Sequence, residues 1–406
     1  MIDNSATNFA RAERIHALDA ARAIALLLGI GLHAALAYMP GPSAWPIMDE
    51  SRSVAPALVF YVIHAFRMLV FFVLAGFFAS ALIERFGTRN FLIDRWKRVA
   101  VPLLVFWPIV LTAIIVAIVW MVKLKFGELP KESPPGPTFR PDDFPLTHLW
   151  FLWVLILFYS VFVTLRTLVD ALKLSQPMGC AARFVATQVS RWYAPLVLAV
   201  PLAIALYLHP KWMHWFGIPT PDKTLYGNIA AWVAYGFAFA VGCAIERHRD
   251  ALGAIRNNTW ALLLVGVTAV LASVSHAEIS ALIGLSAVNA KKALSAFLYA
   301  VAAWALCFAF LSLAMRFLAR SSLRIRYLSA ASYWTYIVHL PIVMFLQVVG
   351  TQWSGGWAIE WPLVVAGTLA LALGSYHLFV RNTWVGVMLN GRRWRDLKSR
   401  EALRNG

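Results

Sequence analysis

The stretch LDAARAIALLLGIGLH, residues 18–33, decides the fold class. With the next few residues it is long and apolar enough to cross a bilayer as a helix, which takes about 20 apolar residues. It nevertheless carries Asp19, Arg22 and His33. Because ionisable groups are costly at membrane depth, they commonly mark a function there. The stretch therefore predicts a transmembrane helix into which a polar site is built.

The composition of the whole chain agrees with this interpretation. Of its 406 residues, 61% are hydrophobic and only 14% are charged, whereas about a quarter of a soluble domain is charged. We therefore expect an all-α, polytopic membrane protein that lies in the lipid bilayer. The net charge of +17 would favour nucleic acid as a partner of a soluble protein. In a membrane protein the positive bias of cytoplasmic loops accounts for it, so no nucleic-acid partner is expected.

Ten segments are long and apolar enough to be spans, and they define a membrane domain over residues 18–380. They are 18–39, 54–83, 99–122, 147–169, 194–209, 225–245, 259–275, 293–315, 333–350 and 359–380. A polar cytoplasmic segment, 1–17, is expected before this domain and a basic cytoplasmic tail, 381–406, after it. The longest loop, 123–146, is rich in proline and charge, which is typical of irregular, solvated chain.

The distribution of lysine and arginine predicts the orientation. With the N-terminus in the cytoplasm, 26 of the 36 Lys and Arg residues fall on the cytoplasmic side, nine on the opposite side, and Arg67 inside a span. This asymmetry favours a multi-pass protein with both termini in the cytoplasm. The loop 123–146 then lies on the outer side.

The charged residues of the first span share one face. Arg22 and His33 are eleven residues apart, close to three helical turns. At 1.5 Å per residue, His33 lies about 16 Å deeper in the membrane than Arg22. Asp19 is one turn before Arg22 and can pair with it. Two interpretations stay open: an arginine that reaches the interface beside a hydrogen-bonded histidine, or a catalytic set of Asp19, Arg22 and His33.

Histidine and arginine recur in two other spans. His64 and Arg67 are one turn apart in VIHAFRMLVFFVLAGFF, and a buried arginine must find carboxylate, phosphate or carbonyl partners. These two residues are candidates for substrate binding; the alternative is that the span bends and Arg67 caps a broken helix end. His339, in SYWTYIVHLPIVMF, is a further candidate for substrate binding. We interpret His148, in HLWFLW, and Glu360 as residues of the membrane interface.

Basic residues also gather before the third predicted span, in RFGTRNFLIDRWKRVAVPLL. Arg95 and Arg98 are one turn apart, with Lys97 between them. Arginines placed in this way can clamp phosphate groups. The alternative is that they are ordinary anchors at the cytoplasmic surface.

These motifs, in their order, resemble the acyltransferase-3 family of integral-membrane O-acyltransferases. The resemblance rests on LDAAR followed by His33, FFVLAGFF, the Arg95–Arg98 pair, HLWFLW and YIVH. Within the family the chain most resembles the branch of periplasmic glucan succinyltransferases. It departs from the family at Ala75–Gly76–Phe77, where Ser-Gly-Phe is common, so no serine role is carried to position 75.

The resemblance implies a ten-helix enzyme of the bacterial inner membrane. Such an enzyme moves a succinyl or acetyl group from cytoplasmic acyl-CoA (succinyl-CoA or acetyl-CoA) to a hydroxyl of a periplasmic or envelope glycan. The family's Arg–ten residues–His motif falls on Arg22 and His33, and its RxxR motif on Arg95 and Arg98. No cofactor is expected to be bound permanently. No metal site is expected either, because the three cysteines lie far apart and form no CxxC pair.

The chemistry gives each group a role. His33 is the expected general base, since a neutral imidazole accepts a proton well near pH 7. Arg67 and His64 are expected to support the tetrahedral intermediate. The CoA phosphates are expected to bind to the basic residues Arg22, Arg95, Lys97 and Arg98. Direct transfer and an acyl-histidine intermediate both stay open. The main alternative function is a secondary transporter of a small anionic or sugar-like solute, because such proteins also carry intramembrane His and Arg.

Overall fold

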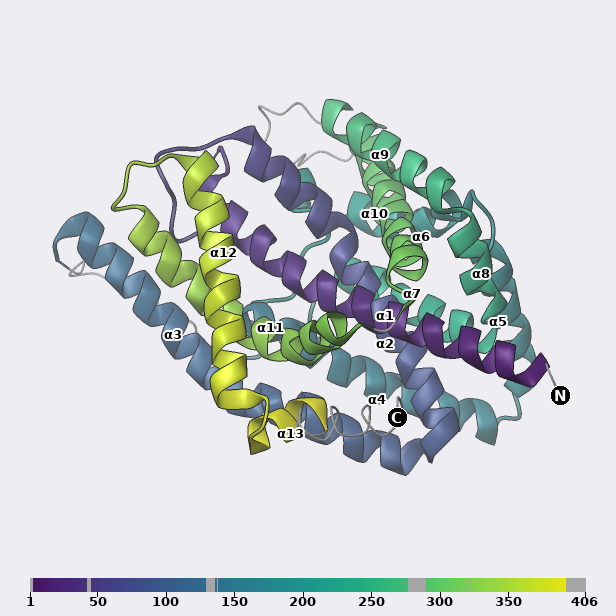
Figure 1. The fold of residues 1–406 in the computed structure, drawn as a ribbon. Helices are drawn as coiled ribbons and strands as arrows, with labels where there is room; N and C mark the ends of the chain where they lie inside the picture. Colours follow the sequence, from purple (N-terminus) through teal and green to yellow (C-terminus); the bar gives the residue numbers. More distant parts are fainter. Residues whose placement is uncertain are drawn as a thin grey trace.

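The computed structural model describes residues 3–41, 45–128, 136, 138–276, 290–320 and 322–391, with side chains from residue 16 onward. Their regular structure is helical, with only an isolated bridge between Arg140 and Asp143, so the predicted all-α class is confirmed. The elements, drawn in Figure 1, are α1 (Asp3–Ala35), η1 (Leu36–Tyr38), α2 (Val54–Arg95), η2 (Trp96–Ala100), α3 (Val101–Phe126), η3 (Thr147–Leu149), α4 (Trp150–Ala171), α5 (Ser175–Val189), α6 (Ala194–Leu208), η4 (His214–Phe216), α7 (Ile229–Arg247), α8 (Asp250–Asn257), α9 (Thr259–His276), α10 (Ala290–Phe317), α11 (Leu323–Gly350), α12 (Trp357–Ser375), η5 (Tyr376–Val380) and α13 (Trp384–Asn390).

Each of the ten predicted spans falls on a helix. Among the described residues, eight helical stretches are long and apolar enough to cross a membrane, or nine when α5 and α6, bent by 114°, count as one span. One of the eight, Val54–Phe126, has 73 residues, or about 110 Å of helix, far more than a bilayer core of about 30 Å. Gly87, with φ 77°, interrupts it. Counting α2 and α3 as two spans then gives the predicted ten.

Several helices extend beyond the predicted limits. α1 begins at Asp3 and α11 at Leu323, so both continue past their apolar parts toward the basic end of the bundle. The loop predicted from residue 123 begins only after Phe126, where α3 ends. α7 begins four residues later than predicted, because the Asn228 side chain caps it by accepting a hydrogen bond from the Ala231 N–H (2.8 Å).

The helices divide into a buried centre and a rim that faces lipid. The most apolar stretch of 18 residues differs in burial from one helix to another. Of this stretch, 78% is buried in α10 and 67% in α1, but only 28% in α9 and in α12. Figure 1 shows α1 and α11 crossing the middle, with α3 and α12 on one side and α9 and α5 on the other. Large apolar side chains are exposed on the rim helices, as a bilayer requires: Leu104, Ile109, Leu264, Leu271, Leu363 and Leu371.

Two glycines bring α2 and α7 into backbone contact. A Cβ at Gly76 would lie 2.0 Å from the carbonyl oxygen of Phe239, and a Cβ at Gly242 would lie 1.9 Å from that of Val73. Only glycine permits this approach, and close packing through small residues is a common way to join helices in membranes. The contact fixes the position of α2, which carries Arg67.

Candidate active site

Three histidines from three different segments meet inside the bundle. His33 lies in the last turn of α1, His148 in η3 and His339 in the middle of α11. The ring centroids of His33 and His339 are 5.3 Å apart, and those of His148 and His339 are 4.9 Å apart. His148 is buried, so its predicted place at the membrane interface is wrong. The short turn of η3 brings its ring against α11 instead.

Two of these rings bond to carbonyls of α11, and Pro341 frees one of those carbonyls. Since proline has no N–H, the carbonyl of Ile337, four residues earlier, lacks its helical donor. Nε2 of His148 lies 3.2 Å from this carbonyl and 3.0 Å from that of Tyr336. Nδ1 of His339 lies 2.7 Å from the Tyr336 carbonyl.

Because carbonyl oxygens only accept, these two ring nitrogens are assigned the protons of neutral imidazoles. The other nitrogen of each ring, Nδ1 of His148 and Nε2 of His339, is buried without a hydrogen-bond partner in the described part of the chain. Each ring therefore keeps one nitrogen as an acceptor. The described residues contain no group of three or more His, Cys, Asp or Glu side chains that could hold a metal ion.

Arg67 lies beside the histidines without an anion. A Cβ at Gly29 of α1 would be 2.0 Å from Nη1 of Arg67 and 3.7 Å from Nε2 of His339, so the guanidinium lies against the Gly29 backbone. Arg67 takes part in none of the ion pairs between described residues, and its Nε is buried without a partner. His64, one turn before Arg67 on α2, stacks on Phe60 with ring centroids 5.3 Å apart. Such an unpaired cation can stabilise developing negative charge.

The structure rules out the alternative account of Arg67. α2 keeps helical geometry around this residue, and its non-helical position is Gly87, almost six turns later. Arg67 therefore does not cap a broken helix end.

At the basic end of the bundle, carboxylates orient the predicted arginines. Asp19 pairs with Arg22 at 3.3 Å. Asp94 pairs with Arg95 and, at 2.9 Å, with Nε of Arg98. The Tyr333 hydroxyl donates to the Arg98 carbonyl at 2.7 Å, which ties this segment to α11.

Two adjoining cavities lead inward from these arginines. The first, which we call the basic cavity, has about 310 Å³ and is lined by His16, Asp19, Arg22, Arg98, Leu318, Arg320, Ser322, Ile325, Arg326, Ser329, Ala330, Tyr333, Leu389 and Asn390. The second, which we call the inner cavity, has about 270 Å³ and is lined by Asp19, Arg22, Leu26, Phe71, Leu74, Ala75, Phe78, Leu82, Arg95, Arg98, Val99, Phe151, Leu152, Leu155, Tyr159, Tyr333, Tyr336 and Leu389. Arg22 and Arg98 line both cavities, so these arginines lie where the two meet.

Tyr336 connects the inner cavity to the histidines. It lines the apolar part of that cavity, and its carbonyl receives the hydrogen bonds of His148 and His339. Its hydroxyl donates to the His148 carbonyl at 2.7 Å. Tyr336 therefore lies between the inner cavity, which arginines and aromatic residues line, and the cluster of imidazoles beside Arg67.

Comparison with known families agrees with this architecture. Residues 15–377 match the acyltransferase domain that defines the acyltransferase-3 family. The chain belongs to this family. The match ends at residue 377, before α13. Two residues of α13, Leu389 and Asn390, nevertheless line the basic cavity.

Several curated relatives are similar over part of the chain. Glucans biosynthesis protein C of Shigella boydii serotype 4 is 32% identical over 157 residues, which are 37% of this chain and 39% of the relative. The proteins of that name from Escherichia coli strains SMS-3-5 and K12 are 32% and 31% identical over the same length. The chain thus matches about two fifths of these relatives. No solved structure matches it.

Placed in the acyltransferase domain, the predicted residues fall into two groups. Arg22, Arg95 and Arg98 line the cavities, whereas Lys97 is exposed and lines neither of them. The second group is the cluster of His33, His339 and Arg67, with His64 one turn before Arg67 on α2. Ala75, the departure from the family pattern, lines the inner cavity with its methyl group.

A tryptophan lies beside the cluster. The rings of Trp45 and His33 have centroids 6.1 Å apart. Gln347 of α11 fixes both, since its Oε1 accepts from the indole N–H at 2.9 Å and its amide donates to the carbonyls of His33 and Ala34 at 3.2 Å. Glu360 was predicted to face the interface but is buried, and its carboxylate accepts a hydrogen bond from the Gly356 N–H just before α12.

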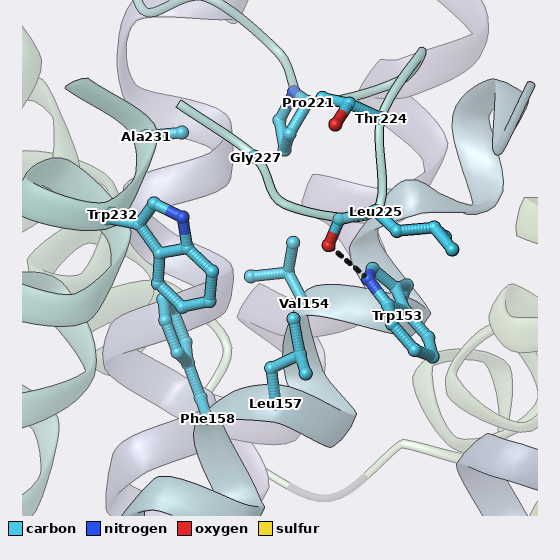
Figure 2. Close-up of a pocket in the computed structure, with 10 residues that line it drawn as sticks. All are labelled: Trp153, Val154, Leu157, Phe158, Pro221, Thr224, Leu225, Gly227, Ala231 and Trp232. Atoms are coloured by element: carbon cyan, nitrogen blue, oxygen red, sulfur yellow. Dashed lines mark hydrogen bonds between the residues drawn. The ribbon is translucent and has the colours of Figure 1, made fainter. Parts of the chain in front are cut away.

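Figure 2 shows another cavity, between the start of α4 and the loop before α7. Trp153, Phe158 and Trp232 line it, and the Trp153 indole donates to the Leu225 carbonyl at 3.0 Å. Its volume of about 10 Å³ is that of a single water site. It contains none of the predicted residues, so we assign no substrate to it.

Proposed function

We propose that this protein is a membrane O-acyltransferase that takes an acyl group from cytoplasmic acyl-CoA and places it on a hydroxyl of a periplasmic or envelope glycan. The observation that carries the proposal is that Tyr336 lines the arginine-lined inner cavity and also bonds, through its carbonyl, to His148 and His339 of the imidazole cluster. The proposed location is the bacterial inner membrane, with both termini in the cytoplasm.

The donor fits the two cavities in chemistry. The phosphates of CoA carry several negative charges, and Arg22 and Arg98 lie where the cavities meet. Charge-assisted bonds from guanidinium groups to phosphate are among the stronger polar contacts in proteins. The narrow pantetheine arm would then pass through the aromatic inner cavity toward Tyr336. CoA is a substrate in this account, and no permanently bound cofactor is required.

In the transfer step, His33 is the group that accepts the proton of the acceptor hydroxyl. An unprotonated nitrogen of His33 takes the proton of the acceptor hydroxyl while the oxygen attacks the thioester carbonyl. Arg67, which has no fixed anion, stabilises the oxyanion of the tetrahedral intermediate. The intermediate collapses, the carbon–sulfur bond breaks, and the CoA thiolate leaves and receives the proton from His33. Hydrogen bonds to carbonyls of α11 fix the tautomers of His148 and His339, so both side chains line the site as neutral imidazoles.

The acceptor would approach from the outer side, beside Trp45. The apolar face of an indole ring can pack against a sugar ring. Gln347 accepts a hydrogen bond from the indole N–H of Trp45 and so fixes this ring next to His33. The relatives are called glucans biosynthesis protein C, which favours a glucan as the acceptor. A succinyl donor would bring a free carboxylate, and Arg67 and His64 are the groups that can meet it.

The test is an assay of purified protein with labelled acyl-CoA and a glucan acceptor. An acyltransferase releases free CoA and gives an acylated glycan whose mass increases by one acyl group. A transporter of a small anionic or sugar-like solute does neither, and instead moves its solute into proteoliposomes. Absence of both CoA release and acylated product, in folded protein with either succinyl-CoA or acetyl-CoA, would contradict the proposal.

A further inference from the structure

We propose that the basic cavity binds the adenosine 3′-phosphate end of CoA, and that Arg320 and Arg326 make the enzyme selective for that phosphate. The inference rests on the proposed function, because it takes acyl-CoA as the donor. Arg320 and Arg326 lie in the connection from α10 to α11 and in the first turn of α11. The sequence alone did not distinguish them from ordinary cytoplasmic cations.

The order of groups along CoA matches the order of the cavities. From the thioester outward, acyl-CoA has the pantetheine arm, the diphosphate and then the ribose that bears the 3′-phosphate. A thioester at His33 places the diphosphate near Arg22, about 16 Å away along α1. The 3′-phosphate must lie further out, and the basic cavity is the space there. Along α11, Arg326 is thirteen residues, or about 20 Å, from His339.

The basic cavity is lined by more cations than carboxylates. Four arginines and one carboxylate, that of Asp19, line it. Asp19 pairs with Arg22, and Asp94 pairs with Arg98. Arg320 belongs to none of the ion pairs between described residues. With four arginines to one carboxylate in its lining, the cavity favours anions, and Arg320 and Arg326 come from its α10–α11 side.

The same side of the cavity offers donors that are not cationic. Ser322, which precedes α11 as its N-cap, and Ile325 and Ser329 in its first two turns line the cavity. The free N–H groups at the start of a long helix favour bound anions. The Ser329 Oγ is buried and has no hydrogen-bond partner in the described part of the chain. An anion bound here would supply that partner.

The experiment compares acyl-CoA with acyl-3′-dephospho-CoA as donors for the same acceptor. The wild-type protein should show a kcat/KM about 10- to 100-fold higher for acyl-CoA, the range expected from one or two charge-assisted bonds. The double variant Arg320→Gln/Arg326→Gln should lose most of this preference by slowing transfer from acyl-CoA. Its unchanged rate with the dephosphorylated donor reports that the protein is folded.

Arg324→Gln is the matched control. Arg324 lies between the two proposed residues and is exposed, but it does not line the cavity. Its removal takes away one cytoplasmic charge and should leave the preference unchanged. Equal loss in this variant would show a general effect of charge and would overturn the assignment.

The remaining outcomes separate this inference from the proposed function. Equal rates with both donors in the wild type would overturn the inference while the acyltransferase activity stands. A preference that persists in the double variant would place the 3′-phosphate elsewhere. A double variant that loses both donors equally would give these arginines a role in folding. A folded wild type that uses neither donor would overturn the proposed function, and this inference with it.

Discussion

The imidazole rings of His33 and His339 lie 5.3 Å apart between centroids, although one belongs to the first helix of the chain and the other to α11. Two features bring them together. The amide of Gln347 ties α11 to the last carbonyls of α1, and Arg67 fits between the helices because residue 29 is a glycine. The chemistry that we propose therefore depends on how α1 and α11 pack, and the predictions below address that packing and the two cavities beside it.

The donor site is tested through the arginine pair. Arg95→Ala with Arg98→Ala should raise KM for acyl-CoA about tenfold or more, because each charge-assisted bond contributes roughly 1.5–3 kcal/mol and these side chains are only partly exposed. Lys97→Ala, an exposed neighbour outside both cavities, should leave KM unchanged. Steady-state kinetics of the two variants checks this. An unchanged KM in the folded double variant would make the arginines simple anchors.

A glycine beyond the acyltransferase domain should influence the same constant. Gly391 ends α13 with φ 75°, and a Cβ there would lie 2.1 Å from Nη2 of Arg98. Gly391→Ala should displace the guanidinium and raise KM for acyl-CoA severalfold. Gly127→Ala is the control, since Gly127 also ends a helix with φ 73° but has nothing within 4 Å of a Cβ. In an Arg98→Ala background, Gly391→Ala should add little; full additivity would mean that Gly391 acts through strain alone.

Gly29 tests the position of Arg67. A Cβ at residue 29 would occupy the place of Arg67 Nη1, whereas a Cβ at Gly31 would meet only Cδ1 of Ile63, at 4.0 Å. Both glycines lie in α1, so both alanine variants gain the same helix propensity. Gly29→Ala should lower kcat about 10²-fold, the usual cost of losing an oxyanion donor, while Gly31→Ala should remain close to wild type. Equal activity of the two variants would remove Arg67 from the transition state.

The orientation can be read from thiol labelling in intact cells. Cys180 is exposed on α5, on the side that the distribution of Lys and Arg predicts to be cytoplasmic. A membrane-impermeant maleimide should label it only after the inner membrane is opened. In a Cys180→Ser protein, Arg140→Cys in the predicted outer loop should be labelled without that step. The reverse pattern would place the arginine-lined entrance on the wrong side for cytoplasmic acyl-CoA.

The sequence predicted most of the fold because a bilayer imposes a simple rule. Apolar segments of sufficient length must be helices, since backbone groups in lipid have no water to bond with. The predictions were less accurate at helix ends. There the limits depend on local partners such as Asn228, which caps α7, and on polar turns that continue α1 and α11 outside the apolar region.

The site was predicted only where a residue was anomalous for its place. His33, Arg67 and His339 attracted attention because they are ionisable at membrane depth. His148 was misplaced because a histidine among aromatic residues at a helix start is typical of the interface, and only Pro341 on a distant helix frees the carbonyl that binds its ring. Asp94, Arg320 and Arg326 were missed, because nothing in the sequence separates a charged residue that binds a ligand near the membrane surface from one that only anchors the helix there.

The most direct test of the account is the rate of acyl transfer by purified His33→Ala protein, followed as CoA release with an acceptor present. The account predicts that the variant folds and binds acyl-CoA with nearly unchanged affinity, because His33 lines neither cavity. Its turnover should fall by roughly 10²–10⁴, the usual contribution of a general base, and His33→Gln should not restore it, since an amide cannot take the proton. Wild-type turnover in His33→Ala would contradict the account, and the base would then have to be His64 or His339.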